Sequence, residues 1–343
     1  MTEHGNKTVQ NTVLTGITTT GTPHIGNYVG AIRPAITASR RNDVLSFFFI
    51  ADYHSLIKSA DPLQRSRSTL EIASAWLACG LDPGRVVLYR QSDVPEIMEL
   101  TWILTCMTAK GLMNRAHAYK AAVAENEAGN SKDPDKGITM GLFCYPILMA
   151  ADILIFKADT VPVGSDQKQH VEMARDIAGR FNHHFGETFV LPEAAITEAS
   201  AVLPGLDGRK MSKSYNNTIP LFLDEKALRK AIMKIKTNSQ EPGEPKNPDD
   251  STLFAIYRAF ATDAETQAIR QRYREGIGWG EMKQTLFEYV NEHLRDARDE
   301  YHRLLAAPDH VEQVLKDGAE KAHGHSRPFL DEIRKRVGIR PLG

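Results

Sequence analysis

Two short runs of residues carry side chains that could bind a nucleotide. The first is HIGN at 24–27, which follows an apolar, strand-like run and a turn that contains Gly21 and Pro23. A turn that links a parallel strand to a helix lies where ligands bind, and the free N–H groups at the helix start favour phosphate. Gly26 leaves room for an adenine base against the backbone, and Asn27 offers neutral hydrogen-bonding groups. Taken alone, this run is also compatible with a plain strand-to-helix turn.

The second run is KMSKS at 210–214, which lies between Gly208 and Asn216. A flexible loop with two lysines can close on a polyphosphate and follow its charge as a bond breaks, which a rigid helix could not do so easily. Taken alone, it could be an exposed basic loop. Together, in this order and in these contexts, the two runs predict a pair of nucleotide-binding loops.

The elements that must position these runs alternate between short β-rich segments and amphipathic helices, a pattern that requires crossover connections and a parallel sheet. Strands are expected at 12–17, 44–51, 86–89 and 160–163, and helices from near Ile25, from Pro62, over 95–107 and from Asp166 to Phe181. The segment 44–51 is apolar on both faces, which is typical of a central buried strand. We therefore predict an α/β fold with a doubly wound parallel sheet in residues 1–219.

The chain beyond Pro220 has long helical periodicity, interrupted by a polar loop over 237–251, and predicts a second, all-helical domain over residues 220–322. A further polar and charged loop is expected over 124–137. Basic residues recur in the helical region and after it, at Lys226, Arg229, Lys230, Arg270, Arg272, Arg274, Arg334, Lys335 and Arg336. Each one fits a solvated helix face with acidic partners nearby, and only their clustering hints at RNA.

The composition is that of an ordinary globular protein. Its 343 residues suffice for roughly two domains with cores of their own, and 42 basic against 43 acidic residues exclude a globally basic coat for nucleic acid. Cys79, Cys106 and Cys144 lie in apolar stretches without a C-x-x-C pair, so we expect buried thiols in a reducing compartment. The first residues show no targeting signal, and no apolar run approaches the ~20 residues of a membrane span. We expect a cytoplasmic protein.

Three longer segments, FIADYH at 49–54, YPILMAADI at 145–153 and VPVGSDQKQH at 161–170, accompany the two runs. With HIGN and KMSKS as signature loops, the chain resembles the bacterial-type tryptophanyl-tRNA synthetases, a family of class I aminoacyl-tRNA synthetases, over nearly its whole length. The resemblance implies a Rossmann-like catalytic domain, a helical anticodon-binding domain and a C-terminal segment, here 323–343, that returns to the catalytic domain. It also implies a homodimer that requires ATP with Mg²⁺.

The resemblance further implies roles for residues at matched positions. Residues expected to contact ATP are Thr18, Thr19, Thr20, Gly26, Asn27, Gly164, Ser165, Asp166, Val202, Lys210, Met211, Ser212, Lys213 and Ser214. Residues expected to bind the amino acid are Tyr145 and Gln167 at its ammonium group, Met149 and His54 along its side chain, and Asp152 at the indole N–H. The candidate catalytic residues are Lys210, Lys213, Ser212, His24 and Asn27, and no cluster for a protein-held metal is expected. Without the resemblance, Tyr145 and Met149 fit core packing at helical spacing, and Asp166 and Gln167 fit helix caps.

The reaction implied is attack of the carboxylate of L-tryptophan on the α-phosphorus of ATP, which releases pyrophosphate and leaves tryptophanyl-adenylate. Transfer of tryptophan to tRNA(Trp) follows. Neither step needs a protein nucleophile, because positioning the reactants and neutralising the charge on pyrophosphate account for most of the rate. The expected partners are L-tryptophan and tRNA(Trp), with no membrane.

Three alternatives remain beside this interpretation. Tyrosyl-tRNA synthetases share both loops but usually have glutamine three residues before the pocket aspartate, where this chain has Met149. The second is a synthetase-like RNA-binding protein without catalysis. It is disfavoured because the chain retains Asn27 and the KMSKS run at 210–214, called the lysine loop below. A small-molecule adenylyltransferase on the same fold would lack the long helical extension.

Overall fold

The computed structural model describes residues 11–19, 21–57, 61–129, 131–196 and 203–340, without the side chain of Asp166. Two predicted ATP-binding residues, Thr20 and Val202, lie outside the described residues.

A five-stranded sheet forms the centre of the first half of the chain. Its strands are β1 (Asn11–Thr18), β2 (Val44–Ala51), β3 (Val87–Arg90), β4 (Thr160–Val163) and β5 (Glu193–Ile196). They pair in the order β3-β2-β1-β4-β5, and every pairing is parallel. The four predicted strands are confirmed, while β5 was not expected, and the α/β fold class with a parallel sheet is confirmed as well.

Alternating side chains of β2 explain why this strand is apolar throughout. Phe48 and Ile50 belong to one buried cluster and Phe47 and Phe49 to another, on the two faces of the sheet. The first face is covered by α4 (Pro62–Ala78), whose Trp76 contacts Phe48 with ring centroids 5.4 Å apart. The second face is covered by α5 (Glu96–Met107), α8 (Met140–Leu154) and α9 (Lys168–Phe185). Because both faces of this parallel strand are buried, polar and apolar residues do not alternate along its sequence.

Helix α4 begins and ends where its sequence predicts. The carboxylate of Asp61 accepts hydrogen bonds from the backbone N–H groups of Leu63 and Gln64, and Pro62 occupies the first helical position. Gly80 follows the helix with φ of +94°, which residues other than glycine rarely adopt.

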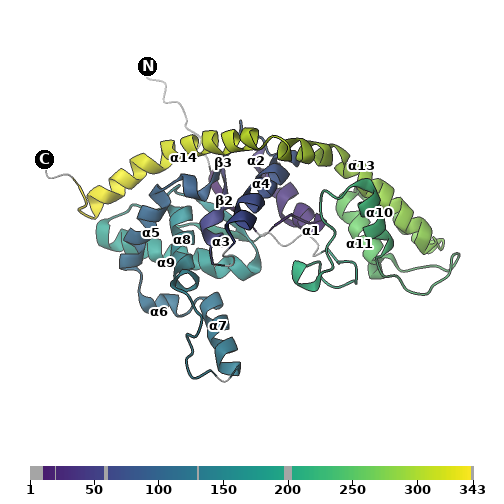
Figure 1. The fold of residues 1–343 in the computed structure, drawn as a ribbon, viewed down its shortest axis with the longest axis horizontal. Helices are drawn as coiled ribbons and strands as arrows, with labels where there is room; N and C mark the ends of the chain where they lie inside the picture. Colours follow the sequence, from purple (N-terminus) through teal and green to yellow (C-terminus); the bar gives the residue numbers. More distant parts are fainter. Residues whose placement is uncertain (1–10, 20, 58–60, 130, 197–202, 341–343) are drawn as a thin grey trace, which may run out of the picture.

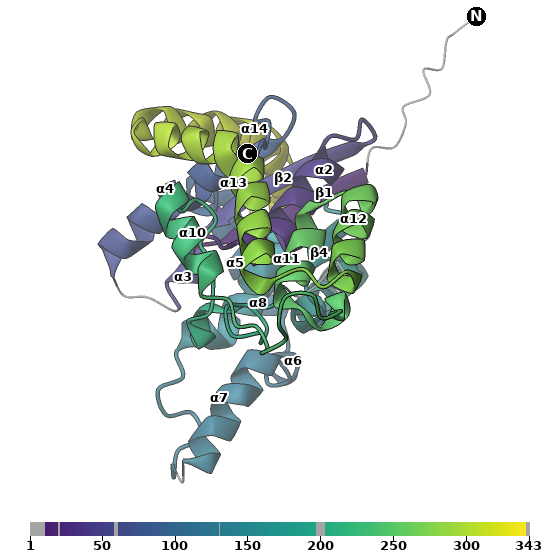
Figure 2. The same cartoon turned by 90° about the vertical axis from the view of Figure 1, so that its right-hand side faces the viewer.

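The shorter elements of this half are α1 (Ile25–Asn27), a π-helical turn η1 (Tyr28–Ile32), α2 (Arg33–Ser39), α3 (Asp52–Ser55), a 3₁₀ turn η2 (Gln91–Asp93), α6 (Lys110–Met113), α7 (His117–Ala128) and a 3₁₀ turn η3 (Ser165–Gln167). Two predictions are corrected here. The loop expected over 124–137 begins as the last turns of α7, which extends away from the sheet in both views (Figures 1 and 2). The helix expected from Asp166 begins as η3, and α9 itself starts at Lys168.

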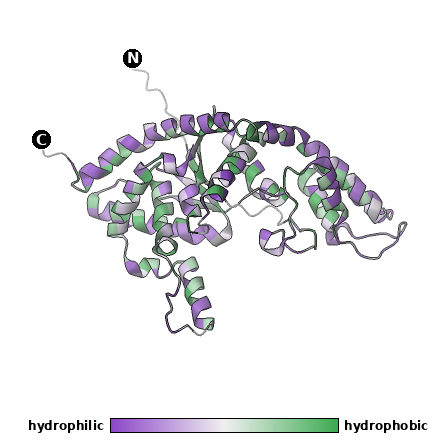
Figure 3. Cartoon of the chain, viewed as in Figure 1, coloured by the Kyte–Doolittle hydropathy of each residue, from purple (hydrophilic) through white to green (hydrophobic). Residues whose placement is uncertain are grey.

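The second half is helical, as predicted from its periodicity. A 3₁₀ turn η4 (Lys213–Tyr215) precedes α10 (Glu225–Met233), a 3₁₀ turn η5 (Pro248–Asp250), α11 (Thr252–Phe260), α12 (Asp263–Arg274), α13 (Trp279–Leu305) and α14 (Pro308–Arg336). Helices α13 and α14 form an arc along one side of the molecule (Figure 1). Hydrophilic and hydrophobic residues alternate along this arc (Figure 3), because each helix buries one face only.

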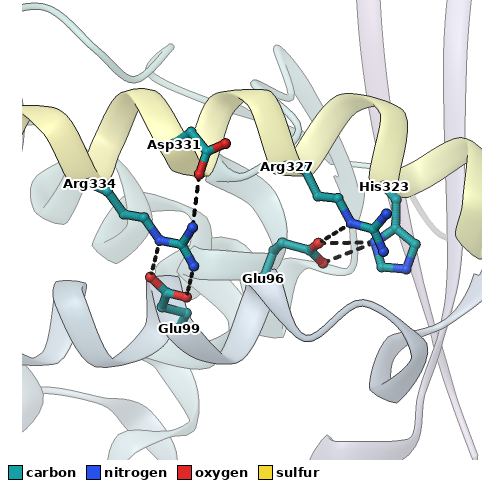
Figure 4. Close-up of polar contacts among 6 residues, drawn as sticks. All are labelled: Glu96, Glu99, His323, Arg327, Asp331 and Arg334. Carbon is teal, nitrogen blue, oxygen red and sulfur yellow. Dashed lines mark hydrogen bonds and ion pairs between the residues drawn. The ribbon is translucent and has the colours of Figure 1, made fainter. Parts of the chain in front are cut away.

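Helix α14 lies against the edge strand β3 and the start of α5. A β-carbon at Gly318 would overlap the carbonyl oxygen of Leu88, so only glycine allows this close approach. Polar side chains continue the contact: His323 and Arg327 hydrogen-bond to Glu96, and Arg334 to Glu99 (Figure 4). The predicted boundary between residues 322 and 323 falls inside this continuous helix, so the division of the second half into two parts stays a prediction.

The expectation of three buried thiols is wrong. Cys106 is exposed on α5, because the apolar stretch of this helix includes a solvent-facing side. Cys79, which ends α4, and Cys144 on α8 are only partly buried. Arg270 and Arg272 are paired with Asp249 and Glu281, which confirms for these two residues the expectation of acidic partners nearby. The hint of an RNA surface stays a prediction. Among the described residues, no helix is long and apolar enough to cross a membrane.

Candidate active site

Polar residues follow four of the strands at one edge of the sheet. Thr18 and Thr19 end and follow β1, His54 lies on α3 directly after β2, Gln91 follows β3, and Gln167 closes the turn after β4. Since the strands are parallel, their carboxyl ends meet at the same edge, which is where open α/β sheets bind ligands.

A cavity of about 570 Å³ opens at this edge. One wall is a face of α8, where Leu142, Tyr145, Met149 and Asp152 recur at helical spacing and all line the cavity. These four side chains therefore face the cavity, although their helical spacing alone would also fit core packing. The other predicted residues on the wall are His54, Gln167, Thr18 and Thr19. Further lining residues, which were not predicted, include Leu14, Gly16, Gly21, Phe49, Arg65 and Val161.

Asp152 is fully buried at the bottom of this wall and is held by two donors. Its Oδ2 lies 2.9 Å from Nε2 of His54, and Nε2 of Gln91 lies 2.8 Å from Oδ1 and 3.0 Å from Oδ2. Burial raises the pKa of the Asp152 carboxyl above its ordinary value, and the hydrogen bonds from His54 and Gln91 oppose this rise. The arrangement presents a carboxylate acceptor to a ligand in an otherwise largely apolar pocket.

Tyr145 is held by a second histidine. Its hydroxyl lies 2.6 Å from Nε2 of His170 on α9, and the two rings meet edge to face with centroids 5.0 Å apart. Gln167 lies at the N-terminus of α9 but its side chain makes no capping hydrogen bond, so the alternative of a capping role for Gln167 is wrong. Tyr145 and Gln167 thus bring hydroxyl and amide groups to the same cavity.

The HIGN run folds as a capping box. The imidazole Nδ1 of His24 accepts from the backbone N–H of Asn27 at 3.3 Å, and the side-chain oxygen of Asn27 accepts from the backbone N–H of His24 at 3.0 Å. Partial burial, and then the charge of Lys213, lower the pKa of His24 to about 4. His24 is therefore a neutral imidazole at neutral pH.

The lysine loop lies beside the HIGN run and the rim of the cavity. A β-carbon at Gly21 would lie 3.6 Å from Nζ of Lys213, and one at Gly26 would lie 3.5 Å from Sδ of Met211. Partial burial lowers the pKa of Lys213, and the carboxylate of Glu71 opposes this shift. The structure thus brings the two signature runs, almost two hundred residues apart in the sequence, into contact distance.

The loop is shaped by its own hydrogen bonds. The hydroxyl of Ser212 caps the turn η4 by accepting from Ser214, and the buried Asn217 accepts from the backbone N–H of Ser212 at 2.8 Å and donates to the carbonyl of Lys210 at 3.1 Å. Lys210, Lys213 and Ser214 are exposed. The ammonium group of Lys213, which lies beside Gly21, can therefore reach a polyphosphate at the rim of the cavity.

The remaining predicted ATP residues lie at the same edge. Thr19 has a buried hydroxyl with no hydrogen-bond partner among the described residues, on the cavity wall, where it can donate to or accept from a ligand. Gly164 and Ser165 follow β4 and are exposed. No group of three or more His, Cys, Asp or Glu side chains in the described part of the chain is placed to hold a metal ion.

Two residues of the site were missed by the sequence interpretation. Gln91 is fully buried behind Asp152, and His170 contacts Tyr145 one helical turn beyond Gln167. Each had a signal, since Gln91 is a polar residue directly after a buried strand and His170 lies within a matched segment. Neither partner could be named from the sequence, because the contacts join elements far apart in the chain.

The chain matches the family model described as tRNA synthetases class I (W and Y) over residues 6–295. It is 62% identical over 334 residues to a tryptophan–tRNA ligase of Pseudomonas aeruginosa, covering 96% of this chain and 74% of that protein. It is 58% identical over 330 residues to a tryptophan–tRNA ligase of Neisseria meningitidis, covering 96% of this chain and 98% of that protein. Among solved structures, it is similar to a tryptophanyl-tRNA synthetase from Campylobacter jejuni complexed with ADP and tryptophan. That similarity has a TM-score of 0.87 and 43% sequence identity, and covers 95% of this chain and 99% of the other.

Proposed function

This chain belongs to the class I tRNA synthetases of the tryptophan and tyrosine group, and we propose that its cavity binds L-tryptophan while its lysine loop binds the phosphates of ATP. Its activity is that of a tryptophan–tRNA ligase, an aminoacyl-tRNA synthetase. Tryptophan is activated with ATP to tryptophanyl-adenylate, pyrophosphate leaves, and tryptophan is transferred to tRNA(Trp).

One observation supports this assignment of the cavity most directly. Tyr145, Met149 and Asp152 share a face of α8 on the wall of a single cavity, and Lys213 lies beside Gly21 at its rim. An aromatic amino acid in the cavity would place its reactive end toward the lysine loop if its ring points to Asp152.

The groups at the two ends of the cavity suit the two ends of tryptophan. Asp152 accepts the indole N–H in a charge-assisted hydrogen bond, and Met149 and His54 contact the ring. At the other end, the hydroxyl of Tyr145 and the amide of Gln167 bind the ammonium group. Met149 stands where tyrosine-specific relatives usually have a polar glutamine, which favours indole over phenol.

The nucleotide lies across the switch point of the sheet, between the ends of β1 and β4. Thr18, Thr19 and Gly26 contact it from one side, and Gly164, Ser165 and Asp166 from the other. Lys210, Met211, Ser212, Lys213 and Ser214 close over the phosphates, and His24 and Asn27 steady them. The contacts of Thr20 and Val202 with ATP remain predictions from the resemblance.

The residues around the phosphates stabilise the negative charge that develops during the reaction. When the tryptophan carboxylate attacks the α-phosphorus, negative charge grows on pyrophosphate, and Lys213 and Lys210 stabilise it. His24 is a neutral donor there because its pKa lies near 4. These donors suit phosphate oxygens rather than a metal, which fits a magnesium ion carried by ATP. Bound Mg²⁺ would supply further positive charge to the phosphates.

The partners follow from this activity. We propose that tRNA(Trp) contacts the helical part, where Lys226 and Lys230 of α10 are exposed. We propose that a second copy of the chain packs against α5 to form a homodimer. Met98, Trp102 and Cys106 recur on one face of this helix, and Trp102 is 69% exposed. Because its tRNA substrate is used by ribosomes, we place the protein in the cytoplasm.

Exchange of labelled pyrophosphate into ATP tests the proposed function. The purified chain is assayed with each of the aromatic amino acids separately, and exchange above background is expected with L-tryptophan. A variant with Glu292→Ala, on the exposed outer side of α13, serves as an unaltered control. Exchange with tyrosine but not with tryptophan would overturn the assignment of the cavity.

A further inference from the structure

Gln91 is the buried neighbour of Asp152 and has no role in the proposed binding of tryptophan or ATP. It is fully buried directly after β3, whereas Asp152 is part of the cavity wall. One nitrogen of Gln91 lies within 3.0 Å of both oxygens of the Asp152 carboxylate, so the donor approaches between the two oxygens. This contact restrains the position of the carboxylate group, because a shift of Asp152 away from Gln91 would lengthen both distances.

The orientation of the Gln91 amide is set by a backbone group. Its oxygen accepts a hydrogen bond from the backbone N–H of Tyr53 at 3.2 Å. A backbone N–H can only donate, so the amide oxygen must face Tyr53 and the NH₂ group must face Asp152. Tyr53 is held in turn, because its N–H also lies 3.0 Å from Oδ1 of Asp52, which accepts from the backbone N–H of Ser92 at 3.0 Å.

The described hydrogen bonds leave one acceptor direction of Asp152 available. Oδ2 accepts from both Gln91 and His54, while Oδ1 accepts from Gln91 alone. A carboxylate oxygen has two lone pairs, so Oδ1 can accept one further hydrogen bond. The indole ring of tryptophan has one N–H donor, and phenylalanine has none.

We propose that Gln91 is a positioning residue for amino-acid selection, which anchors the Asp152 carboxylate in place so that Oδ1 meets the indole N–H. The inference rests on the proposed binding of tryptophan in this cavity. Gln91 does not contact the substrate and acts only through Asp152. Removing its amide lets the carboxylate shift and weakens the bond to tryptophan, but has no direct effect on a ligand without the N–H.

The test compares two substrates of nearly equal shape. Gln91→Met keeps the approximate length of the side chain and removes its donors. The ratio of kcat/KM for tryptophan to that for benzothienylalanine, in which sulfur replaces the indole N–H, is measured by pyrophosphate exchange. This ratio should fall about tenfold or more in the variant, as expected for weakening a hydrogen bond to a charged group, while KM for ATP stays unchanged.

A matched control is Asn182→Leu. Asn182 is also a buried amide, and it makes hydrogen bonds to the backbone of Thr188 and Phe189 outside the cavity wall. Its replacement should lower stability without changing the substrate ratio. If Gln91→Met does not fold, Gln91→Leu also lacks the donor, introduces no new charge and should likewise lower the ratio.

A double-mutant cycle separates action through Asp152 from a general effect. Adding Gln91→Met to Asp152→Ala should change the ratio no further, since the residue that Gln91 positions is already gone. An unchanged ratio in both Gln91 variants would overturn the inference, as would an additive effect in the cycle. A wild-type chain without preference for tryptophan would instead overturn the proposed function, so the two failures are distinguishable.

Discussion

The imidazole Nδ1 of His323 on α14 lies 3.1 Å from each carboxylate oxygen of Glu96 at the start of α5. Both side chains are buried, and Arg327 donates to the same carboxylate at 2.9 Å (Figure 4). This pair joins the last helix of the chain to the helix that follows β3. It explains how a segment more than two hundred residues away becomes part of the packing of the catalytic half.

Glu96→Ala should lower the free energy of unfolding by about 1 to 3 kcal/mol, because His323 would lose its buried partner. Denaturant unfolding of the full chain measures this change. Glu292→Ala removes an exposed partner of Arg295 on α13 and should cost less than about 1 kcal/mol. Equal effects of the two substitutions would show that the buried pair contributes no more than a surface pair.

Asp152→Ala should reduce the preference for tryptophan over phenylalanine. In the wild type, phenylalanine would leave a buried charged acceptor without its donor, and sites built in this way reject such analogues by about 10⁴- to 10⁵-fold. The variant loses the bond to indole, while activation of phenylalanine falls much less. Competitive pyrophosphate exchange with both amino acids measures the ratio, and a ratio equal to that of the wild type would assign Asp152 a purely structural role.

Lys213→Ala should slow adenylate formation by about 10²- to 10³-fold, or ~3 to 4 kcal/mol, while tryptophan binding stays nearly unchanged. The reason is that its charge matters most as pyrophosphate leaves. Pre-steady-state adenylate formation is the measurement, and Lys226→Ala, an exposed lysine on α10, is the control. A rate within about threefold of the wild type contradicts the role assigned to Lys213.

The pKa of His24 near 4 predicts a dependence of stability on pH. The pKa in the folded chain lies below the ordinary value of 6.5, so between these values the unfolded chain binds more protons. The contribution of His24 is therefore fully present above about pH 6.5 and is lost as the pH falls toward 4.

An NMR titration of the imidazole checks this value directly. Lys213→Ala should move the pKa of His24 upward only in part, because burial is the larger cause and the charge of Lys213 the smaller. A His24 that titrates near its ordinary value in the wild-type chain would contradict the burial seen in the structure.

Local features of this protein were determined by the sequence alone. Asp61, Pro62 and Gly80 predicted both ends of α4, and the apolar run 44–51 predicted β2 residue for residue. These signals are readable because caps, turns and strand patterns depend on neighbours within a few positions. The signature runs likewise identified the reaction class, since each lies in one short segment.

Interactions between distant segments were decided only by the tertiary structure. Gln91 holds Asp152, His170 holds Tyr145, and Asp249 pairs with Arg270, where the sequence had hinted at an RNA contact. The sequence shows which side chains can donate, accept or carry charge. It does not show which of many equally suitable partners comes within 3 Å, because that depends on how the sheet, α8 and α14 pack over their whole length. The physical reason is that hydrogen bonds act only at short range, whereas the residues they join here are brought together by the burial of apolar surface across the entire chain.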